Sequence, residues 1–448
     1  MNNAIKLQKI ISSHGHKILA AGGFVRDYLL GLKAKDIDLA TSALPEEVVS
    51  ILKEHNIQSI PTGLKHGTIT AVMDKTPYEI TTLRVDKICH GRDADVEFVS
   101  SFEEDAKRRD LTINALFMDL ETKEIFDYVD GKRDIENKVL RFVGDPEKRI
   151  KEDCLRILRF YRFYSNLGFI PEEESLKACK KFLPYLCYVS SERIRDEVSK
   201  MVIGGNIQTL FLDNQDMVST IFPEIKPIIG FDQKGCYYHD TDVYNHTLRG
   251  LKELSQRKYA DPVLSIAHLF HDVAKPFCHT HVDGSDHFYG HEVEGEPIVD
   301  KVMSRLKFSS KEISRAKFLV RNHMRLNNNL SKKALRRLLH DCEEYGDRLL
   351  IKDLWKIHMA DCHGMINQSI YPEDLINEIL EEKKDVFKCP LSGKDLINEF
   401  GLKEGAVLGK ILRNLKELVV NGELSPDDKT AARVFVEKQI EELNDGKS

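Results

Sequence analysis

The chain has 448 residues, a length that predicts two to four domains, each able to bury a hydrophobic core of its own. Hydrophobic residues make up 42% and charged residues 31%, as in globular proteins, and no apolar run approaches the roughly 20 residues of a membrane span. The net charge of −6 argues against a protein that coats nucleic acid nonspecifically, and nine scattered cysteines without a C-x-x-C pair argue against a disulfide framework.

The predicted elements begin with an N-terminal segment that lacks the apolar block of a signal peptide, so we expect a cytoplasmic protein. Residues 1–133 mix β-type runs such as HKILAAGG and GTITAVM with helical stretches such as LPEEVVSILKEH. From residue 134 the periodicity of amphipathic helices dominates, and prolines and glycines interrupt it near residue 230. We therefore predict an α+β fold: a mixed sheet with helices in 1–133, all-α segments in 134–230 and 231–388, and a helical tail in 389–448.

A pair of glycines and three acidic residues mark the first candidate site. Gly22 and Gly23 lie where a predicted strand ends and a helix begins, a place where backbone amides can receive phosphate, although a tight turn alone explains such a pair. If Asp36 and Asp38 share a strand, alternation places both carboxylates on one face, with the two Cα atoms about 6.6 Å apart. Glu79, on a later predicted strand, could join them. Carboxylates so placed suit two-metal phosphoryl transfer, whereas a polar strand end in solvent is the simpler alternative.

Four polar residues follow at steps of three in the helical stretch KEDCLRILRFYRF: Asp153, Arg156, Arg159 and Arg162. On one helix they form a slowly winding stripe. Since arginine offers a planar fork of donors and aspartate an acceptor, one adjacent pair can hydrogen-bond the edge of a base. A solvated charge stripe is the alternative.

Histidines concentrate in the second half, where 12 of the 17 fall between His239 and His363. Imidazole and carboxylate are the usual ligands of Mn, Fe, Ni or Mg, and adjacent His271 and Asp272 can reach one ion from one helical turn. The predicted metal ligands are His246, His271, Asp272 and Asp361, with His291 and His323 as further candidates. We expect His268, His340 and His358 to be packing residues.

Six motifs in order resemble the class II CCA-adding tRNA nucleotidyltransferases and bacterial poly(A) polymerases. They are GGFVRDYLLGLKAKDIDLAT, KHGTITAV, YEITTLRVD, RRDLTINALFMD, DYVDGKRDIENKVLRFVGDPEKRIKEDCLRILRFYRF and SSERIRDEVSKM, within residues 18–203. The order H…HD…D downstream resembles the HD phosphohydrolase superfamily. The resemblance implies a nucleotidyltransferase head at 1–133, a neck and body at 134–230, an HD domain at 231–388 and a helical tail at 389–448.

The resemblance also implies roles for individual residues. Asp36 and Asp38 match the pair that binds catalytic Mg²⁺, with Glu79 as third carboxylate, and Asp153 with Arg156 matches the pair that reads the incoming base. The residues implied to contact the nucleotide are Gly22, Gly23, Arg26, Arg109, Asp110, Asn114, Asp153, Arg156, Arg159 and Arg162. Helix capping is the simpler explanation for Asp110 and Asn114.

The implied activity is addition of C, C and A to the 3′ end of tRNA from CTP and ATP, with neither DNA nor a membrane as partner. The polar segment Val85–Glu97, with Gly91 and Arg92, matches a flexible loop needed for the final A, and its length favours full CCA addition. A poly(A) polymerase and an enzyme adding only CC or A are alternatives. An alternative of another class is a tRNA-binding or signalling protein in which only the HD half is active.

For the HD half, the resemblance implies a divalent transition metal or Mg²⁺ and activity as a phosphatase or 2′,3′-cyclic phosphodiesterase. Lys275 matches a lysine that lies near the substrate phosphate in that superfamily.

Overall fold

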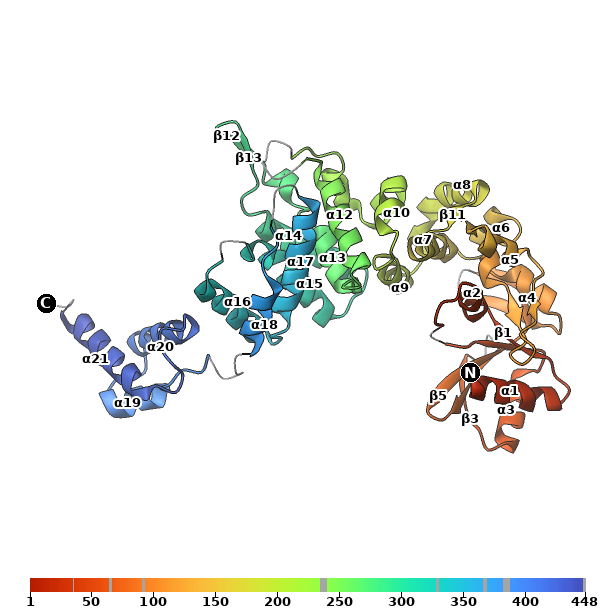
Figure 1. The fold of residues 1–448 in the computed structure, drawn as a ribbon, viewed down its shortest axis with the longest axis horizontal. Helices are drawn as coiled ribbons and strands as arrows, with labels where there is room; N and C mark the ends of the chain where they lie inside the picture. The colour runs from red at the N-terminus through yellow and green to blue at the C-terminus, as the bar shows by residue number, and fades with distance from the viewer. Residues whose placement is uncertain are drawn as a thin grey trace. The chain divides into compact units, whose positions relative to one another are not determined.

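The computed structural model of the chain describes residues 1–34, 36–63, 67–90, 93–233, 240–327, 330–365, 369–381 and 387–445. Two compact units make up the protein, Met1–Pro223 and Glu224–Ser448 (Figure 1). None of the helices within these described ranges has both the length and the apolar character that crossing a membrane requires.

The first unit contains a mixed seven-stranded sheet in the order β3-β4-β5-β2-β1-β8-β9. Its strands are β1 (Ile18–Ala21), β2 (Leu39–Thr41), β3 (Gln58–Gly63), β4 (Thr68–Met73), β5 (Thr76–Thr82), β8 (Phe117–Met118) and β9 (Ile125–Phe126). Only β2 and β5 pair in parallel; the remaining neighbours are antiparallel. The predicted mixed sheet is therefore confirmed.

Helices α1 (Asn2–Ser13) and α3 (Pro45–Glu54) contact each other and the strands β1, β3 and β4 (Figure 1). In α1 the apolar residues Ala4, Leu7 and Ile11 recur every three or four positions and are buried, as expected for a helix that covers a sheet. Pro45 begins α3 with a φ suited to the first helical turn, and the Glu47 carboxylate accepts the Leu44 amide at 2.7 Å. These two helices therefore pack against the sheet strands β1, β3 and β4.

The segment Val85–Glu97 is not the loop that the sequence predicts. Strands β6 (Arg84–His90) and β7 (Asp93–Phe98) form an antiparallel hairpin across it. The β-type residues in VDKICH and DADVEF are compatible with strands, whereas the charged residues among them favour a loop when the sequence is considered alone. Gly91 and Arg92, at the tip, lie outside the described residues.

Helices build the rest of the first unit. They are α2 (Gly23–Leu29), α4 (Phe102–Arg108), α5 (Gly131–Glu136), α6 (Pro146–Glu152), α7 (Leu155–Leu167), α8 (Glu173–Phe182), α9 (Ser191–Met201), α10 (Ile207–Asp213) and α11 (Gln215–Ile221). The prediction of an all-α segment here is wrong in one detail, because β10 (Val139–Leu140) and β11 (Ile170–Pro171) form a short parallel pair. This pair ties the start of the segment to the turn after α7.

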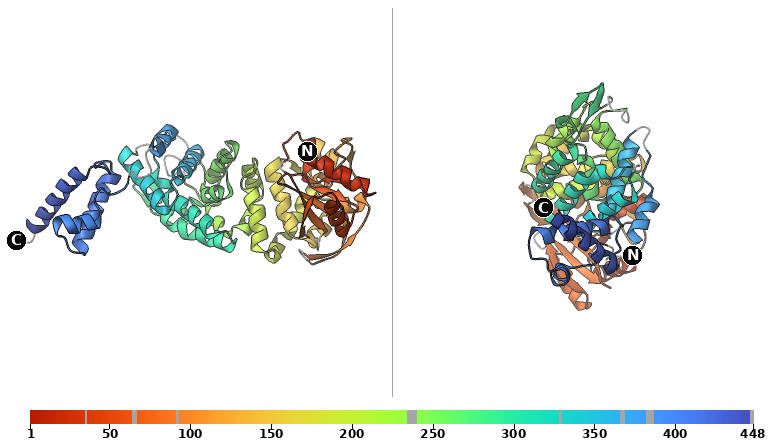
Figure 2. Two further views of the ribbon diagram at one scale, coloured as in Figure 1. Left: turned by 90° about the horizontal axis from the view of Figure 1, so that it is seen from below. Right: turned by 90° about the vertical axis from the view of Figure 1, so that its left-hand side faces the viewer.

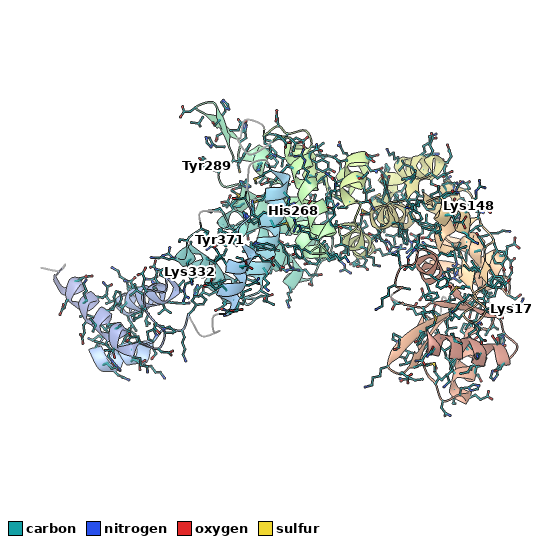
Figure 3. The ribbon with its side chains drawn as sticks, in the orientation of Figure 1. Lys17, Lys148, His268, Tyr289, Lys332 and Tyr371 are labelled. Carbon is teal, nitrogen blue, oxygen red and sulfur yellow. The ribbon has the colours of Figure 1, made fainter. Side chains whose placement is uncertain are left out.

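The second unit is mainly helical, with α12 (Val243–Gln256), α13 (Pro262–Phe270), α14 (His291–Arg305), α15 (Ser310–Asn322), α16 (Lys332–Tyr345), α17 (Leu350–Gly364) and α18 (Glu373–Glu381). The prediction of an all-α segment is again wrong in one detail, since β12 (Thr280–Val282) and β13 (Ser285–His287) form an exposed hairpin. Tyr289, just beyond it, is 80% exposed, whereas His268 on α13 is fully buried (Figure 3).

Three further helices have a core of their own: α19 (Gly393–Phe400), α20 (Ala406–Val420) and α21 (Lys429–Asp445), drawn in dark blue in Figure 2. Its buried residues all come from positions 391–436. Polar contacts link α20 to α16, among them the Arg336 guanidinium on the Val420 carbonyl and Arg337 on Glu417. The predicted helical tail therefore includes a small hydrophobic cluster.

Candidate active site and metal centre

One cavity of about 880 Å³ in the first unit brings together every transferase residue that the sequence singles out. Its lining includes Gly22, Gly23, Arg26, Asp36, Asp38, Glu79, Arg109, Asp110, Asn114, Asp153, Arg156, Arg159 and Arg162. These residues come from the sheet edge, from α2 and from the segments around α4, α6 and α7. Residues more than 100 positions apart thus face one space.

Asp36 and Asp38 precede β2 instead of lying on it, so the strand prediction for them is wrong. The ladder partners of β1 in β2 run from Leu39 to Thr41, and one further bond, from the Ala21 amide to the Asp38 carbonyl at 2.9 Å, holds the backbone of Asp38 at the end of β1. The parallel register of Leu39 with Ile80 nevertheless brings Asp38 beside Glu79. Burial, and then the charges of Glu79 and Asp36, raise the pKa of Asp38.

Desolvation and the two neighbouring carboxylates disfavour the ionised form of Asp38, and a bound cation would offset both effects. Oxygen ligands alone are what Mg²⁺ prefers, so the donor set fits this ion. The carboxylate oxygens of Asp36, Asp38 and Glu79 do not all lie within 4.8 Å of one another, whereas three other groups of described residues, each with histidine nitrogens and carboxylate oxygens, meet this distance. The three carboxylates therefore share a cavity without forming a closed cage.

Gly22 makes the turn between β1 and α2 with a φ of 68°, a conformation that favours glycine. A Cβ atom there would lie 3.1 Å from Nη1 of Arg109, a tight contact that a small shift of the arginine would relieve. Arg109 and Arg26 are held by Asn114: its carbonyl oxygen accepts from Arg109 at 3.2 Å and its side-chain oxygen accepts from Arg26 at 2.7 Å. Asn114 thus orders two cations and does not cap a helix.

Asp110 and Arg159 form an ion pair with 2.6 Å between Oδ2 and Nε. Burial alone would raise the pKa of Asp110, but Arg159 and the Leu111 amide lower it to about 2. A buried carboxylate with this pKa remains ionised at neutral pH and fixes the arginine that faces the cavity. Arg162, one turn further along α7, is paired with Glu197 at 3.0 Å.

Asp153 and Arg156, the pair predicted to read the base, lie at a helix break and just after it. Helix α6 ends at Glu152, Asp153 is extended with φ −155° and ψ 107°, and α7 begins at Leu155. The prediction of one continuous helix is therefore wrong. The Asp153 carboxylate accepts the amide of Leu155 at 3.1 Å, a local bond of the kind that starts a new helix.

The side chains of Asp153 and Arg156 both hydrogen-bond other protein groups. Both carboxylate oxygens of Asp153 accept from Arg193, at 2.6 and 3.2 Å. Arg156 donates to Glu152 at 2.6 Å and to the carbonyl oxygens of Arg149 and Arg108, each at 3.1 Å. The sequence reasoning overlooked Glu152 and Arg193, although each belongs to a quoted motif.

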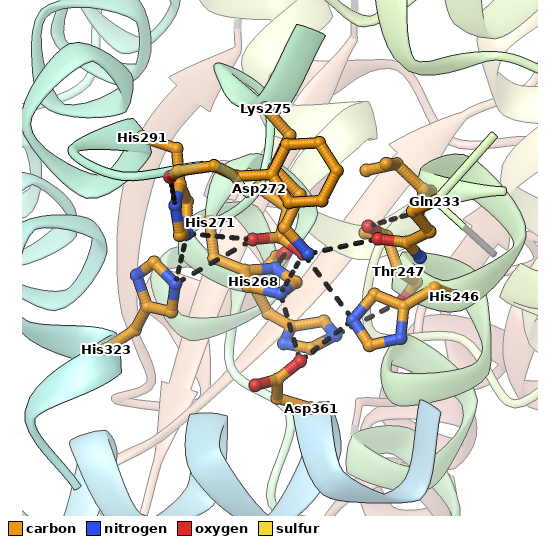
Figure 4. A network of polar contacts seen from close by, with 12 residues as sticks. Gln233, His246, Thr247, His268, His271, Asp272, Lys275, His291, His323 and Asp361 are labelled. Carbon is orange, nitrogen blue, oxygen red and sulfur yellow. Dashed lines mark hydrogen bonds and ion pairs between the residues drawn. The ribbon is translucent and has the colours of Figure 1, made fainter. Parts of the chain in front are cut away.

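In the second unit, five histidine and aspartate side chains surround Asp272 (Figure 4). One group of potential ligands is His246, His271, Asp272 and Asp361, and a second is Asp272, His291 and His323; all are buried. Within each group the ligand atoms lie within 4.8 Å of one another. Asp272 belongs to both groups, with Oδ2 3.2 Å from His271 Nε2 and Oδ1 3.2 Å from His291 Nε2.

The ring orientations fit a metal centre. Nδ1 of His271, His291 and His323 lies 2.6 to 2.7 Å from the carbonyl oxygen three residues earlier in each case. A ring whose Nδ1–H donates to a carbonyl directs its Nε2 toward a metal ion. Gly364 leaves space for His246, because a Cβ atom at that glycine would lie 2.5 Å from the His246 ring.

The buried side chain of Lys275 places a positive charge in this centre (Figure 4). Its Nζ lies 2.6 Å from Asp272 Oδ2 and 3.1 Å from Gln233 Oε1. Burial opposes protonation of His271, but Asp272 and Asp361 raise its pKa to about 10. A proton and a metal ion therefore compete for that ring. His268, expected to pack, is buried and stacks on His271 at 4.6 Å.

Comparison with known proteins identifies the family. Residues 18–141 match the Poly A polymerase head domain, and residues 168–229 match the probable RNA and SrmB-binding site of polymerase A. The chain is 30% identical over 419 residues to the human mitochondrial CCA tRNA nucleotidyltransferase 1, covering 92% of this chain and 84% of that protein. It is 29% identical to the CCA-adding enzyme of Staphylococcus saprophyticus, covering 92% of both. The chain belongs to the CCA tRNA nucleotidyltransferase family.

Solved structures share its fold. The CCA-adding enzyme of Bacillus stearothermophilus, solved with CTP, matches 99% of this chain with a TM-score of 0.72 at 24% identity, over 98% of that chain. The Thermotoga maritima CCA-adding enzyme, solved with tRNA, matches 99% of this chain and 95% of that one with a TM-score of 0.59 at 19% identity. The expected fold is thereby confirmed.

Proposed function

We propose that this chain adds C, C and A in turn to the 3′ end of tRNA, using CTP and ATP and releasing pyrophosphate. The observation that carries the proposal is the single cavity in which Asp36, Asp38 and Glu79 face Arg26 and Arg109. Acidic residues on one side and arginines on the other match a reaction that needs metal ions at the attacking oxygen and positive charge at the triphosphate. Membership in the CCA tRNA nucleotidyltransferase family supports the same reaction.

In this proposal Asp36, Asp38 and Glu79 hold Mg²⁺, which, when bound, activates the RNA 3′-hydroxyl and stabilises charge on the α-phosphate. Arg26 and Arg109 bind the triphosphate, and Asn114 keeps their guanidinium groups in place before the substrate arrives. Because these groups are already positioned, they lose little conformational entropy when the nucleotide binds.

Asp153 and Arg156 select the base. The aspartate accepts from the exocyclic amine that cytosine and adenine share, and the arginine donates to ring acceptors. Glu152 holds the guanidinium of Arg156, and Arg193 holds the carboxylate of Asp153. We assign these two residues a positioning role, since each acts through its partner.

A primer-extension assay with tRNA that ends at the discriminator base tests the proposal. Wild type should add C, C and A in order with CTP, ATP and Mg²⁺, and should stop there. Long A tracts would favour a poly(A) polymerase, and products that end after CC would favour a partial enzyme. No incorporation by protein that binds tRNA would favour a binding or signalling protein with a spent transferase site.

We propose a second activity for the second unit, hydrolysis of phosphate esters at a divalent metal centre. Its support is the pair of ligand groups that share Asp272, together with the buried ammonium of Lys275, which can contact a substrate phosphate. The test is metal analysis of the purified protein, followed by hydrolysis of 2′,3′-cyclic AMP and of p-nitrophenyl phosphate with Mn²⁺, Ni²⁺ or Mg²⁺. Protein that retains no metal and hydrolyses neither ester would contradict this assignment.

We propose the following domain organisation: a head at 1–133, a neck and body at 134–230, a domain with the metal centre at 231–388 and a tail at 389–448. The division between the two units at 223/224 lies close to one of these borders. A cytoplasmic location is also part of the proposal; fractionation of the source cells would test it.

A further inference from the structure

Phe163 is the one aromatic side chain among the described residues that line the large cavity. It lies on α7, seven residues after Arg156, and is 8% exposed. Most of the other lining residues are arginines and carboxylates, to which a phenyl ring offers no ordinary hydrogen bond. The ring therefore meets charged groups as well as the apolar core.

Two arginines place their guanidinium groups over this ring. Cζ of Arg26 lies 5.0 Å from the ring centroid, and Cζ of Arg162 lies 4.2 Å from it. Both arginines line the large cavity, and their side chains are only 11% and 10% exposed. A cation over the face of an aromatic ring is attracted by the negative charge of that face, most strongly where water is excluded.

Like charges crowd this part of the cavity. Burial, together with the charges of Arg159 and Arg26, lowers the pKa of Arg162, although its partner Glu197 opposes the shift. Guanidinium groups at such short range repel one another and need other groups to hold them. Phe163 attracts two of them without adding a negative charge that would repel a phosphate.

Hydrogen bonds hold the edges of the Arg26 guanidinium. Asp27 Oδ1 accepts from Nε at 2.9 Å and from Nη2 at 2.7 Å, and Asn114 Oδ1 accepts from Nη1 at 2.7 Å. These bonds use three of the five N–H donors, so the contacts made by the described residues leave two donors for a phosphate. Phe163 adds a contact from a different part of the first unit, because Arg26 lies on α2 and Phe163 on α7.

Helix α7 carries Arg156 and Phe163 on nearly the same side. Seven residues make almost two turns, so these positions differ by about 20° around the axis and by about 10.5 Å along it. In the proposed function Arg156 contacts the base and Arg26 contacts the triphosphate. One helix thus supports groups that bind both ends of the nucleotide.

We propose that Phe163 is a positioning residue whose ring holds the Arg26 guanidinium for the triphosphate, so that α7 fixes this arginine as well as the base-reading Arg156. The inference rests on the proposed nucleotidyl transfer. The ring acts through Arg26 and does not itself bind the nucleotide. A ring that stacked on the incoming base would be a binding residue, and the test separates these two roles.

The test compares Phe163→Leu with Phe182→Leu in the full-length protein. Phe182 is a matched control because it is 6% exposed and has Nζ of Lys151 and of Lys181 each 5.4 Å from its ring centroid, yet it does not line the large cavity. The probe is inorganic tripolyphosphate, which has no base, as a competitive inhibitor of C addition. Phe163→Leu should raise its inhibition constant and the KM for CTP by about 2- to 30-fold, the range of one cation–π contact, and Phe182→Leu should change neither.

Three further measurements separate a positioning role from a merely structural one. Phe163→Tyr keeps the ring and should restore the wild-type inhibition constant. The ratio of kcat/KM for CTP to that for UTP should stay unchanged in Phe163→Leu, because Asp153 and Arg156 are intact. Adding Phe163→Leu to Arg26→Ala should cause little further loss, since Phe163 acts through Arg26. If Phe163→Leu does not fold, Phe163→Met, which also lacks the ring, replaces it in each comparison.

Equal inhibition constants for wild type, Phe163→Leu and Phe182→Leu would overturn the proposal, as would an additive loss in the double variant. A raised KM for CTP with an unchanged inhibition constant for tripolyphosphate would also overturn it, because the ring would then contact the base or the ribose. If Arg26→Ala binds tripolyphosphate as tightly as wild type, the triphosphate role of Arg26 in the proposed function is wrong. If Arg26→Ala weakens that binding and Phe163→Leu does not, only the role of Phe163 is wrong.

Discussion

Substitution of Asp153 by alanine separates base reading from a merely structural ion pair. The carboxylate is bound on both oxygens by Arg193, and the Asp153 and Arg193 side chains are 21% and 24% exposed. A pair this close to solvent contributes about 1 kcal/mol or less to stability, so the fold should tolerate its loss. A base contact, in contrast, contributes about 1–3 kcal/mol of discrimination, or roughly 5- to 150-fold.

Asp153→Ala should therefore let UTP compete with CTP, because uracil lacks the exocyclic amine that the carboxylate would accept. The measurement is kcat/KM for CTP, UTP, ATP and GTP on tRNA ending at the discriminator base. Asp240→Ala is the matched control, since Asp240 forms an exposed ion pair with Arg249 at 2.7 Å in the second unit. If the ratios among nucleotides stay at their wild-type values, Asp153 does not read the base, even if every rate falls.

Asp36→Ala should abolish nucleotide addition, while tRNA binding in a gel-shift assay stays near wild type because Arg26 and Arg109 keep their hydrogen bonds to Asn114. Extension at an undiminished rate would rule out Asp36 as a metal ligand of the transferase. Asp272→Asn should remove the bound metal and phosphate-ester hydrolysis but spare CCA addition, since the contacts of Asp272 lie within the second unit. Metal analysis, the ester-hydrolysis assay and the primer-extension assay test this, and loss of CCA addition in folded protein would contradict separate sites. The pKa of Asp110 is about 2 in the folded protein and near 4 in the unfolded chain. The ionised carboxylate therefore stabilises the folded state by about 2 kcal/mol above pH 4, and this contribution is lost as the pH falls through 2. Urea unfolding should show the difference in stability between wild type and Asp110→Asn shrinking over that window, and a constant difference would refute it.

Motif order was sufficient to predict the class of fold and the residues that line the cavity, because each motif carries a side chain that the chemistry requires. Periodicity located α3, because burial of one helix face imposes a spacing that the sequence displays. The seven-stranded order could not be read in this way, since β2 and β5 pair across a long stretch of chain.

What the sequence could not provide was mostly local backbone geometry. The break at Asp153 depends on its carboxylate, which accepts the Leu155 amide and so competes with continuation of the helix. The spacing of residues in the sequence does not show whether such a bond forms. The pairing of Arg193 with Asp153 depends on which helices meet, and the spacing of residues in the sequence does not show it. Lys275 and Asp272, in contrast, are only three residues apart. The ligand group around Asp272 was easier to predict because histidines are rare and their clustering needs a cause.

The small core of α19, α20 and α21 draws only on neighbours in the chain, from Leu391 to Val436. Contacts between near neighbours form quickly, because little chain entropy is lost when the intervening loops close. This bundle can therefore fold without contacts from any distant part of the chain. The seven-stranded sheet, in contrast, has to wait for β8 and β9, which follow β1 by about a hundred residues.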